Sequence, residues 1–264
     1  MVIDMTNNPS DIAIENNNLK PSRKPGKRHQ EPFILKVFQK TFKIVGHISP
    51  SLAGKLAYEL WLTPTRYKTP ASERKALDSA FIESHRINGK EITSYTWHPS
   101  VADERATVLL VHGWSGRGTQ MGPFAEPLTR AGYRVISFDA PAHGKSSGKQ
   151  TSLFEISDTI LALQDIYGEF DSVISHSFGG PCTALALQHG LKTNRIISIC
   201  PPASTIGLVD KFCNALKLNR KTRKNIIDRI SNTFGDHIWQ ELSMTSTVKG
   251  VELPGLVIHD AHDE

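Results

Sequence analysis

One stretch of the sequence, residues 171–189, constrains the fold more than any other. An apolar strand pattern at 173–175 meets the small residues around Ser177, and a helical pattern follows at once over 178–189. Such a corner pushes a serine hydroxyl out of the sheet, where a substrate can meet it. The stretch therefore predicts a strand–turn–helix unit with Ser177 as a candidate nucleophile. The alternative is a serine that only caps the helix, since serine is a favoured N-cap residue.

Strand and helix patterns alternate on both sides of this unit. Apolar strand patterns recur at residues 107–111, 133–138, 195–199 and 256–259, and helical patterns at 121–131 and 153–167. This alternation predicts a parallel sheet with right-handed crossovers and helices on both faces. Upstream, Asn88-Gly89 joins two further strand patterns, at 80–86 and 91–98, as a two-residue hairpin. The predicted fold class is a doubly wound, mostly parallel α/β sheet, in which ligands bind at the carboxyl ends of the strands.

Three segments are predicted along the chain. Residues 1–31 are rich in Asn, Pro and Lys and nearly free of aromatic residues, so we expect a disordered basic arm. Residues 32–71 carry two helical patterns. The α/β domain comprises residues 72–264. Helical patterns over about 201–250 interrupt its alternation of strands and helices. An insertion of this kind predicts a helical lid that excludes water and selects substrates.

The first of the two early helical patterns is basic and amphipathic. Ile34, Phe38 and Val45 recur at helical spacing, whereas the lysines fall largely on other faces. Two interpretations fit such a helix: it packs onto the domain behind it, or it lies on a membrane surface through residues 32–46. In the second pattern, over residues 51–62, three leucines share one face and predict packing in the same outer layer.

Composition and charge restrict the expected partners and the cellular location of the protein. The formal net charge is +5, with basic runs near the start and over residues 217–229, but no stacking aromatics accompany them. A nucleic acid is therefore not the expected partner. The start of the chain lacks the pattern of a secretion signal, and no apolar run is long enough to span a bilayer. The three cysteines lack metal-ligand spacing, so we expect reduced thiols and a cytoplasmic location.

Two loops at strand ends carry further candidate residues. The loop that begins at His112 follows a buried strand, and there the backbone N–H of Trp114 and that of Phe178 can form an oxyanion hole. The second loop begins at Asp139 and contains His143. Proline and glycine shape this loop, and we interpret both histidines as loop architecture and not as catalytic bases.

Together these motifs resemble those of the α/β-hydrolase superfamily. The similarity covers about residues 80–264 and rests on His112-Gly113-Trp114, Asp139-x-Pro141-x-His143-Gly144-x-Ser146 and Ser175-His176-Ser177-Phe178-Gly179-Gly180. In that family an elbow serine attacks an acyl carbon, a histidine is the base, and an acid after a later strand orients the histidine. The resemblance implies Asp263 as this acid, with Asp260 as the second choice. It implies no cofactor and no metal.

The resemblance also implies a missing part. In the family the catalytic histidine follows the acid after a further helix and strand, and this sequence ends at Glu264. We therefore expect a truncated hydrolase fold that lacks the last strand and helix. Its strand at residues 256–259 would then form an unprotected sheet edge.

Two functions follow from these observations. The first is a serine hydrolase, resembling carboxylic-ester hydrolases, that cleaves an ester, thioester or amide of a small-molecule acyl substrate through an acyl-enzyme. A serine at the elbow favours this chemistry over the alkyl displacement of relatives that carry aspartate there. The alternative is a catalytically inactive hydrolase fold that binds an acidic partner or a membrane surface.

Overall fold

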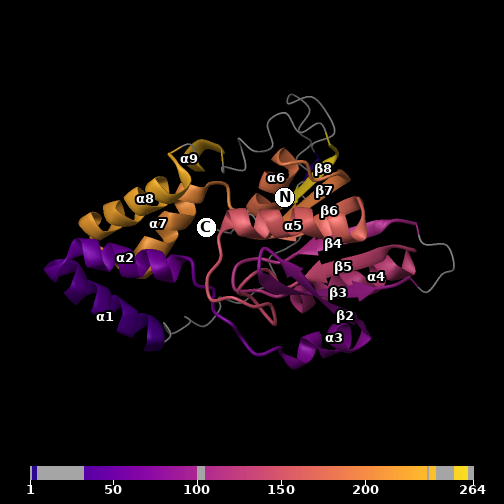
Figure 1. The fold of residues 1–264 in the computed structure, drawn as a ribbon, viewed down its shortest axis with the longest axis horizontal. Coiled ribbons are helices and arrows are strands. Elements are labelled where there is room, and N and C mark those ends of the chain that lie inside the picture. Colours follow the sequence, from indigo (N-terminus) through magenta and orange to yellow (C-terminus); the bar gives the residue numbers. More distant parts are fainter. Residues whose placement is uncertain (1, 5–32, 100–104, 237, 242–252, 261–264) are drawn as a thin grey trace, which may run out of the picture.

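The computed structural model describes residues 2–4, 33–99, 105–236, 238–241 and 253–260. Its strands are β1 (Val2–Asp4), β2 (Phe81–Ile87), β3 (Lys90–Trp97), β4 (Thr107–Val111), β5 (Arg134–Phe138), β6 (Phe170–His176), β7 (Thr193–Ile199) and β8 (Gly255–Ile258). Within the described ranges they form one eight-stranded sheet in the order β1-β8-β7-β6-β4-β5-β3-β2 (Figure 1). The neighbouring strands β8, β7, β6, β4 and β5 are parallel to one another. The pairs β1–β8, β5–β3 and β3–β2 are antiparallel. The predicted doubly wound, mostly parallel sheet is confirmed.

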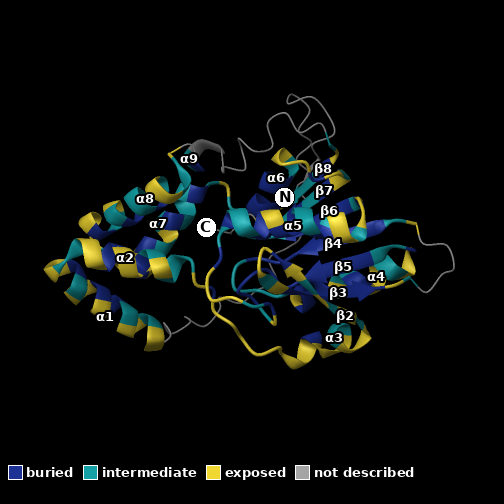
Figure 2. Cartoon of the chain, viewed as in Figure 1, coloured by how far each residue is buried: buried dark blue, intermediate teal, exposed yellow. Residues whose placement is uncertain are grey.

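Strand β4 is buried on both faces, as its uninterrupted apolar run predicts. Leu109 and Val111 join one core cluster, whereas Val108 and Leu110 join the other. Helices α5 (Leu153–Tyr167) and α6 (Gly179–Gln188) cover the first cluster. The second is covered by α3 (Arg74–Ser79), the 3-10 helix η2 (Gly118–Phe124) and α4 (Ala125–Arg130). Figure 2 shows the resulting pattern, with buried central strands between partly exposed helices.

The preferences of single residues explain the turn between β2 and β3 and the start of α4. Asn88 and Gly89 both have positive φ, 47° and 77°, which confirms the predicted hairpin between β2 and β3. The helix predicted over residues 121–131 is partly wrong. The segment starts as the 3-10 helix η2 and becomes α-helical only at Ala125, because Pro123 lacks the N–H that an α-helix needs in its interior.

A helical layer lies beside the sheet, at the left of Figure 1. It consists of α1 (Phe33–Ile48), α2 (Pro50–Trp61), α7 (Thr205–Ala215), α8 (Arg220–Phe234) and α9 (Ile238–Glu241). Helices α7 to α9 follow β7 and precede β8, so the predicted helical insertion is present. Side chains of Ser204 and Asn219 cap α7 and α8 by accepting bonds from backbone N–H groups three residues on. Residues 242–250 of the predicted lid lie outside the described residues.

The packing face of α2 differs in part from the prediction, because only Leu60 of the three leucines packs against the core. Leu52 and Leu56, from the predicted leucine face, are exposed to 49% and 38%. The small residues Ala53, Gly54 and Ala57 are buried instead, and α2 lies against α8. A Cβ placed on Gly54 would lie 2.4 Å from the Cβ of an α8 asparagine, so only small side chains allow the two backbones to approach this closely.

Two predictions about the chain ends are corrected by β1. Val2–Asp4, within the predicted disordered arm, pairs antiparallel with β8 in the register Val2↔Ile258. The edge of β8 is therefore covered, because its free backbone groups find partners on this short extended segment. Residues 5–31 of the arm lie outside the described residues, and the three segment boundaries stay a prediction. Among the helices that the structure describes, none is long and apolar enough to cross a bilayer.

Candidate active site

The corner between β6 and α6 places Ser177 at the carboxyl end of the sheet. Ser177 has a positive φ of 49°, an uncommon conformation for a residue with a side chain. Its backbone is fixed on both sides: its N–H donates to the carbonyl of Ile199 at 2.8 Å, and its carbonyl accepts from the N–H of Gly180 at 2.9 Å. The sharp strand–turn–helix corner predicted at Ser177 is therefore present; its backbone is strained, and neighbouring elements hold it in place.

The residues on either side of Ser177 fit the close packing of this corner. A Cβ placed on Gly179 would lie 2.8 Å from the carbonyl oxygens of both Val111 and His112, so the start of α6 needs glycine there to lie against the end of β4. Ser175 is buried, and its hydroxyl contacts Ser198 Oγ at 3.1 Å on β7. The hydroxyl of Ser175 thus has a partner within the sheet and does not face the substrate side.

Two backbone N–H groups beside Ser177 have no acceptor in the described part of the chain. One belongs to Trp114, in the loop after β4, and the other to Phe178, which follows the serine. The rings of Trp114 and Phe178 contact each other edge to face, with centroids 5.3 Å apart. The loop and the elbow therefore lie side by side, and both predicted oxyanion donors come from adjacent backbone segments.

The side chains of His112 and His143 both hold loops. His112 Nδ1 donates to the carbonyl of Gly113 at 2.7 Å, and its Nε2 accepts from the N–H of Ala140 at 3.0 Å. His143 Nδ1 donates to the carbonyl of Pro141 at 2.9 Å, and its Nε2 accepts from the N–H of Ser115 at 3.0 Å. Each ring uses both nitrogens on the backbone, which confirms their interpretation as loop architecture.

Burial keeps these two imidazoles neutral. It lowers the pKa of His112 to about 4 and that of His143 to about 3, because a buried ring loses the hydration that stabilises its charged form. For His143 the nearby His112 adds to this shift. A neutral ring can accept one hydrogen bond and donate another, which is how both rings join the loops.

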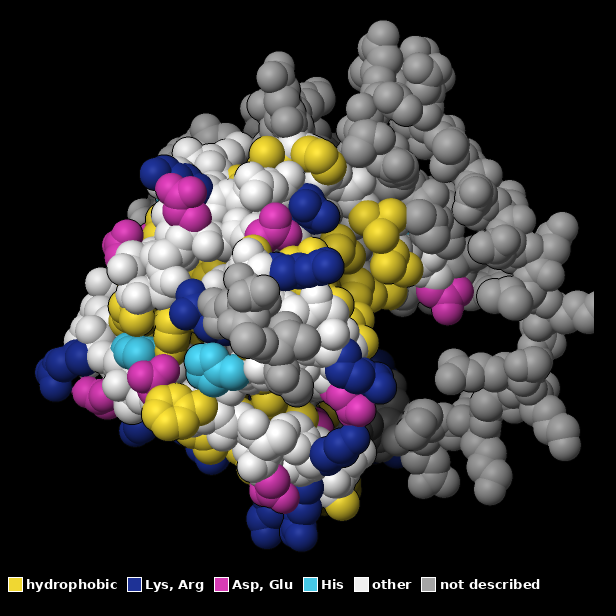
Figure 3. Space-filling view, turned by 90° about the vertical axis from the view of Figure 1, so that its right-hand side faces the viewer, with side chains coloured by type: hydrophobic (Ala, Val, Ile, Leu, Met, Phe, Trp, Pro, Cys, Tyr) yellow, Lys and Arg dark blue, Asp and Glu magenta, His cyan; other side chains and the backbone are white. Residues whose placement is uncertain are grey.

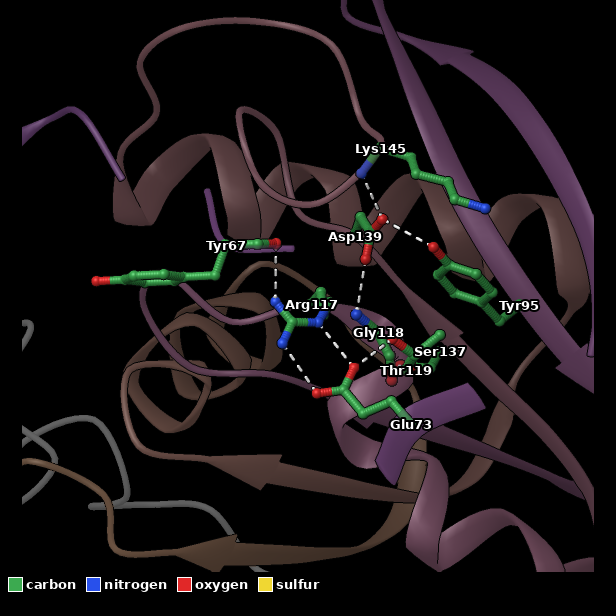
Figure 4. Close-up of polar contacts among 9 residues, drawn as sticks. All are labelled: Tyr67, Glu73, Tyr95, Arg117, Gly118, Thr119, Ser137, Asp139 and Lys145. Carbon is green, nitrogen blue, oxygen red and sulfur yellow. Dashed lines mark hydrogen bonds and ion pairs between the residues drawn. The ribbon is translucent and has the colours of Figure 1, made fainter. Parts of the chain in front are cut away.

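Asp139 ties the loop after β5 to the loop after β4. Its carboxylate accepts from the backbone N–H of Gly118 and from that of Lys145, both at 2.7 Å, and from the Tyr95 hydroxyl at 2.9 Å (Figure 4). Burial raises the pKa of Asp139, while these donors favour the ionised form. Asp139 thus belongs to the loop architecture, as the sequence predicts.

A second polar cluster supports the same loop, and sequence reasoning missed it. Glu73 binds Arg117 through two bonds, of 2.7 Å from Nε and 2.9 Å from Nη2, and accepts from the Thr119 hydroxyl at 2.6 Å (Figure 4). Hydrogen bonding to Glu73 is the main cause that raises the pKa of Arg117. Because Glu73 and Arg117 are 44 residues apart, no local pattern in the sequence links them.

Ser177 opens into an apolar cavity of about 440 Å³ between the elbow and the helical layer. Its lining comprises Leu35, Phe38, Leu60, Trp61, Leu62, Thr63, Thr65, Trp114, Ser115, Thr151, Ser152, Leu153, Phe154, Ser177, Phe178, Thr205, Leu208, Phe212, Ala215, Leu216, Ile230, Phe234 and Ile238. None of these described lining residues is charged. The cavity therefore suits a neutral, apolar group beside the serine hydroxyl.

The predicted acid lies only partly within the described structure. Asp263 falls outside the described residues, whereas Asp260 lies just past the end of β8. Ile199 of β7 pairs with His176 on one side and with Ile258 on the other, so the ends of β6 and β8 are two strands apart, roughly 10 Å. The loop after β8 thus leaves the sheet at the same edge as Ser177. Among the described residues, no group of three His, Cys, Asp or Glu is placed to hold a metal ion.

Comparisons with known proteins agree with this geometry. The family model described as alpha/beta hydrolase fold matches residues 106–248. A 2-hydroxy-6-oxononadienedioate/2-hydroxy-6-oxononatrienedioate hydrolase of Comamonas testosteroni is 30% identical over 44% of this chain and 43% of its own length. A monoacylglycerol lipase of Mycolicibacterium smegmatis is 28% identical over 36% of each chain. The chain thus matches less than half of the length of these relatives.

One solved structure covers most of the chain. The crystal structure of a membrane phospholipase A matches with a TM-score of 0.51 over 87% of this chain and 81% of that chain, at 17% identity. At this identity the match concerns the fold alone. It extends the agreement beyond residues 106–248, the range of the family match.

Proposed function

The chain belongs to the alpha/beta hydrolase fold family, and from this we propose that it is a serine hydrolase with Ser177 as its nucleophile. One observation carries the proposal. The strained corner at Ser177 faces an apolar cavity, and two backbone N–H groups without described acceptors lie beside it. A helix-capping serine does not explain this arrangement, because the N-cap residue of α6 is Phe178 and not Ser177.

The proposed reaction is acyl transfer in two steps. Ser177 Oγ attacks the carbonyl carbon of an ester, thioester or amide, and its proton passes to a base. The N–H groups of Trp114 and Phe178 stabilise the negative charge that develops on the carbonyl oxygen. The leaving group takes up a proton and departs, and water then cleaves the acyl-enzyme to release the acid.

The catalytic acid and the catalytic base are proposed from the similarity to the family. Asp263, which follows β8 in the sequence, is the proposed acid, and a histidine is the proposed base. His112 and His143 are not that base, because both nitrogens of each ring are bonded to the backbone.

The cavity favours a neutral and apolar acyl group. The dicarboxylate named for the Comamonas testosteroni relative would meet no charged partner among the described lining residues, and an unpaired buried carboxylate is costly. The acyl chain of a monoacylglycerol, named for the Mycolicibacterium smegmatis relative, carries no charge. We therefore place the substrate of this chain among uncharged esters with an apolar acyl chain.

A fluorophosphonate probe tests this proposal, since it reacts covalently with an activated serine. We expect labelling of the folded protein and of Ser175→Ala, and loss of labelling in Ser177→Ala. Ser175 is the matched control because it lies two residues away with its hydroxyl buried in the sheet. Labelling that persists in Ser177→Ala, or folded protein that takes no label, would overturn the assignment.

A further inference from the structure

Helix α1 has three distinct faces. Its packing face, which includes Phe42 and Gly46, is buried in the helical layer. Leu35 and Phe38, on the same side, line the cavity beside Ser177. This half of the helix confirms the first interpretation of the sequence, in which α1 packs onto the domain.

The second face of α1 is apolar and exposed. Phe33 and Ile48, at the two ends of the helix, are exposed to 81% and 80%, and Ile34 and Ile44 to 59% and 62%. Val37 lies on the same stripe, since these residues fall within about a third of a turn of one another at 3.6 residues per turn. Isolated exposed apolar residues are normal, but five of them on one face of a 16-residue helix, interrupted only by Thr41, mark an interaction surface.

The third face of α1 is cationic. Lys36, Lys40 and Lys43 are exposed and follow the edge of the apolar stripe, and the helix contains no Asp or Glu. The other end of the molecule differs, because Asp and Glu side chains lie between the Lys and Arg side chains there (Figure 3). The partner of α1 must therefore offer an apolar phase bordered by negative charge.

We propose that α1 docks on an anionic lipid bilayer, with its apolar stripe in the acyl region and its lysines at the phosphate groups. An amphipathic helix with this arrangement lies in the plane of the membrane interface. A second copy of the chain fits less well, because it would bring the same lysines together. This inference goes beyond the proposed function and does not depend on Ser177.

The position of the cavity gives the docking a consequence. Leu35 and Phe38, which line the cavity, belong to the same helix as the exposed stripe. Docking would therefore bring the helix that forms one wall of the cavity to the membrane surface.

Vesicle sedimentation tests the docking. The full chain is mixed with vesicles of phosphatidylcholine and phosphatidylglycerol in equal parts, or of phosphatidylcholine alone. We expect binding to the anionic vesicles that weakens as salt is added. Replacing Lys36, Lys40 and Lys43 together by Gln should weaken it by roughly a hundredfold, and Ile44→Ser with Ile48→Ser by at least about tenfold.

A matched control distinguishes docking through α1 from nonspecific binding of exposed apolar residues to lipid. Phe81→Ser with Ile82→Ser changes two apolar residues on β2 that are exposed to 62% and 43%, away from α1 (Figure 1). This control should bind anionic vesicles as the unchanged chain does, and circular dichroism should confirm that every variant is folded. The proposal is overturned if the unchanged chain does not sediment with anionic vesicles. It is equally overturned if either α1 variant binds normally, or if the β2 control loses as much binding as the α1 variants.

Discussion

The Nε2 atom of His143 accepts a hydrogen bond from the backbone N–H of Ser115, with 3.0 Å between the two nitrogens. Ser115 follows Trp114, a proposed oxyanion donor, so the ring of His143 sets the path of the loop that carries this donor. Protonation of Nε2 would remove the lone pair that accepts the bond. The loop therefore depends on a neutral imidazole.

This dependence predicts a loss of stability in acid. Burial lowers the pKa of His143 to about 3 and that of His112 to about 4, below the ordinary value of 6.5. Between about pH 6.5 and pH 4 the unfolded chain binds protons that the folded chain excludes, so the free energy of unfolding falls as the pH is lowered. Each histidine contributes at most about 1.4 kcal/mol per pH unit. Urea denaturation across this range measures the slope.

His143→Gln is the matched variant for this measurement. Glutamine offers an oxygen that can accept from the Ser115 N–H, but it does not titrate. The slope of the free energy of unfolding against pH should fall by the share of His143, at most about 1.4 kcal/mol per pH unit, because His112 and Asp139 are present in both proteins. An unchanged slope in the variant would contradict the assignment.

Gly144 should tolerate no side chain. It has a φ of 45°, and a Cβ placed there would lie 2.2 Å from the carboxyl carbon of Asp139. Asp139 cannot withdraw easily, since its oxygens hold the N–H groups of Gly118 and Lys145. Gly144→Ala therefore adds steric overlap to the backbone strain of a positive φ.

Gly89→Ala provides the control for the strain alone. Gly89 also has a positive φ, of 77°, but a Cβ there would meet no atom within 4 Å. We expect Gly89→Ala to lower the free energy of unfolding by about 1–2 kcal/mol, and Gly144→Ala by about 1–3 kcal/mol more. Equal losses, measured by denaturant unfolding, would mean that Asp139 imposes no steric limit.

The sequence predicts the parts of this fold that depend on local rules. The turn at Asn88-Gly89 and the alternating strands and helices follow from residue preferences that act within a few positions. The elbow at Ser177 belongs to the same class, because small residues around a serine allow a strand-to-helix corner.

The parts that the sequence did not predict depend on partners far along the chain. The pairing of Val2–Asp4 with β8 joins the two ends of the chain, and hydropathy gives no sign of it. On α2 two of the three leucines, Leu52 and Leu56, lie off the packing face, because closeness to α8 selects small residues over large ones. The partner of Glu73, Arg117, is likewise set by the fold and not by spacing.

The ion pair of Glu73 and Arg117 should contribute strongly to stability. Its side chains are only 10% and 12% exposed, and Glu73→Gln would remove the carboxylate that binds the guanidinium directly. Breaking a buried pair in this way costs about 3–5 kcal/mol. Glu126→Gln is the control, because the Lys75–Glu126 pair is exposed and should leave the unfolding midpoint nearly unchanged. Equal midpoints for the two variants would show that burial does not strengthen the Glu73 pair.

Filling the cavity should change which acyl chains the proposed hydrolase accepts. Leu208 of α7 lines the cavity, and Leu208→Trp would take up part of its volume of about 440 Å³. Long acyl chains should lose kcat/KM by about tenfold or more relative to short ones, since each methylene excluded from an apolar pocket costs binding in the transition state. Ile206→Trp makes a similar change on α7 at a position that does not line the cavity, and it should keep the original preference. Assays with nitrophenyl esters of increasing chain length measure both variants; an unaltered preference in Leu208→Trp would place the acyl chain elsewhere.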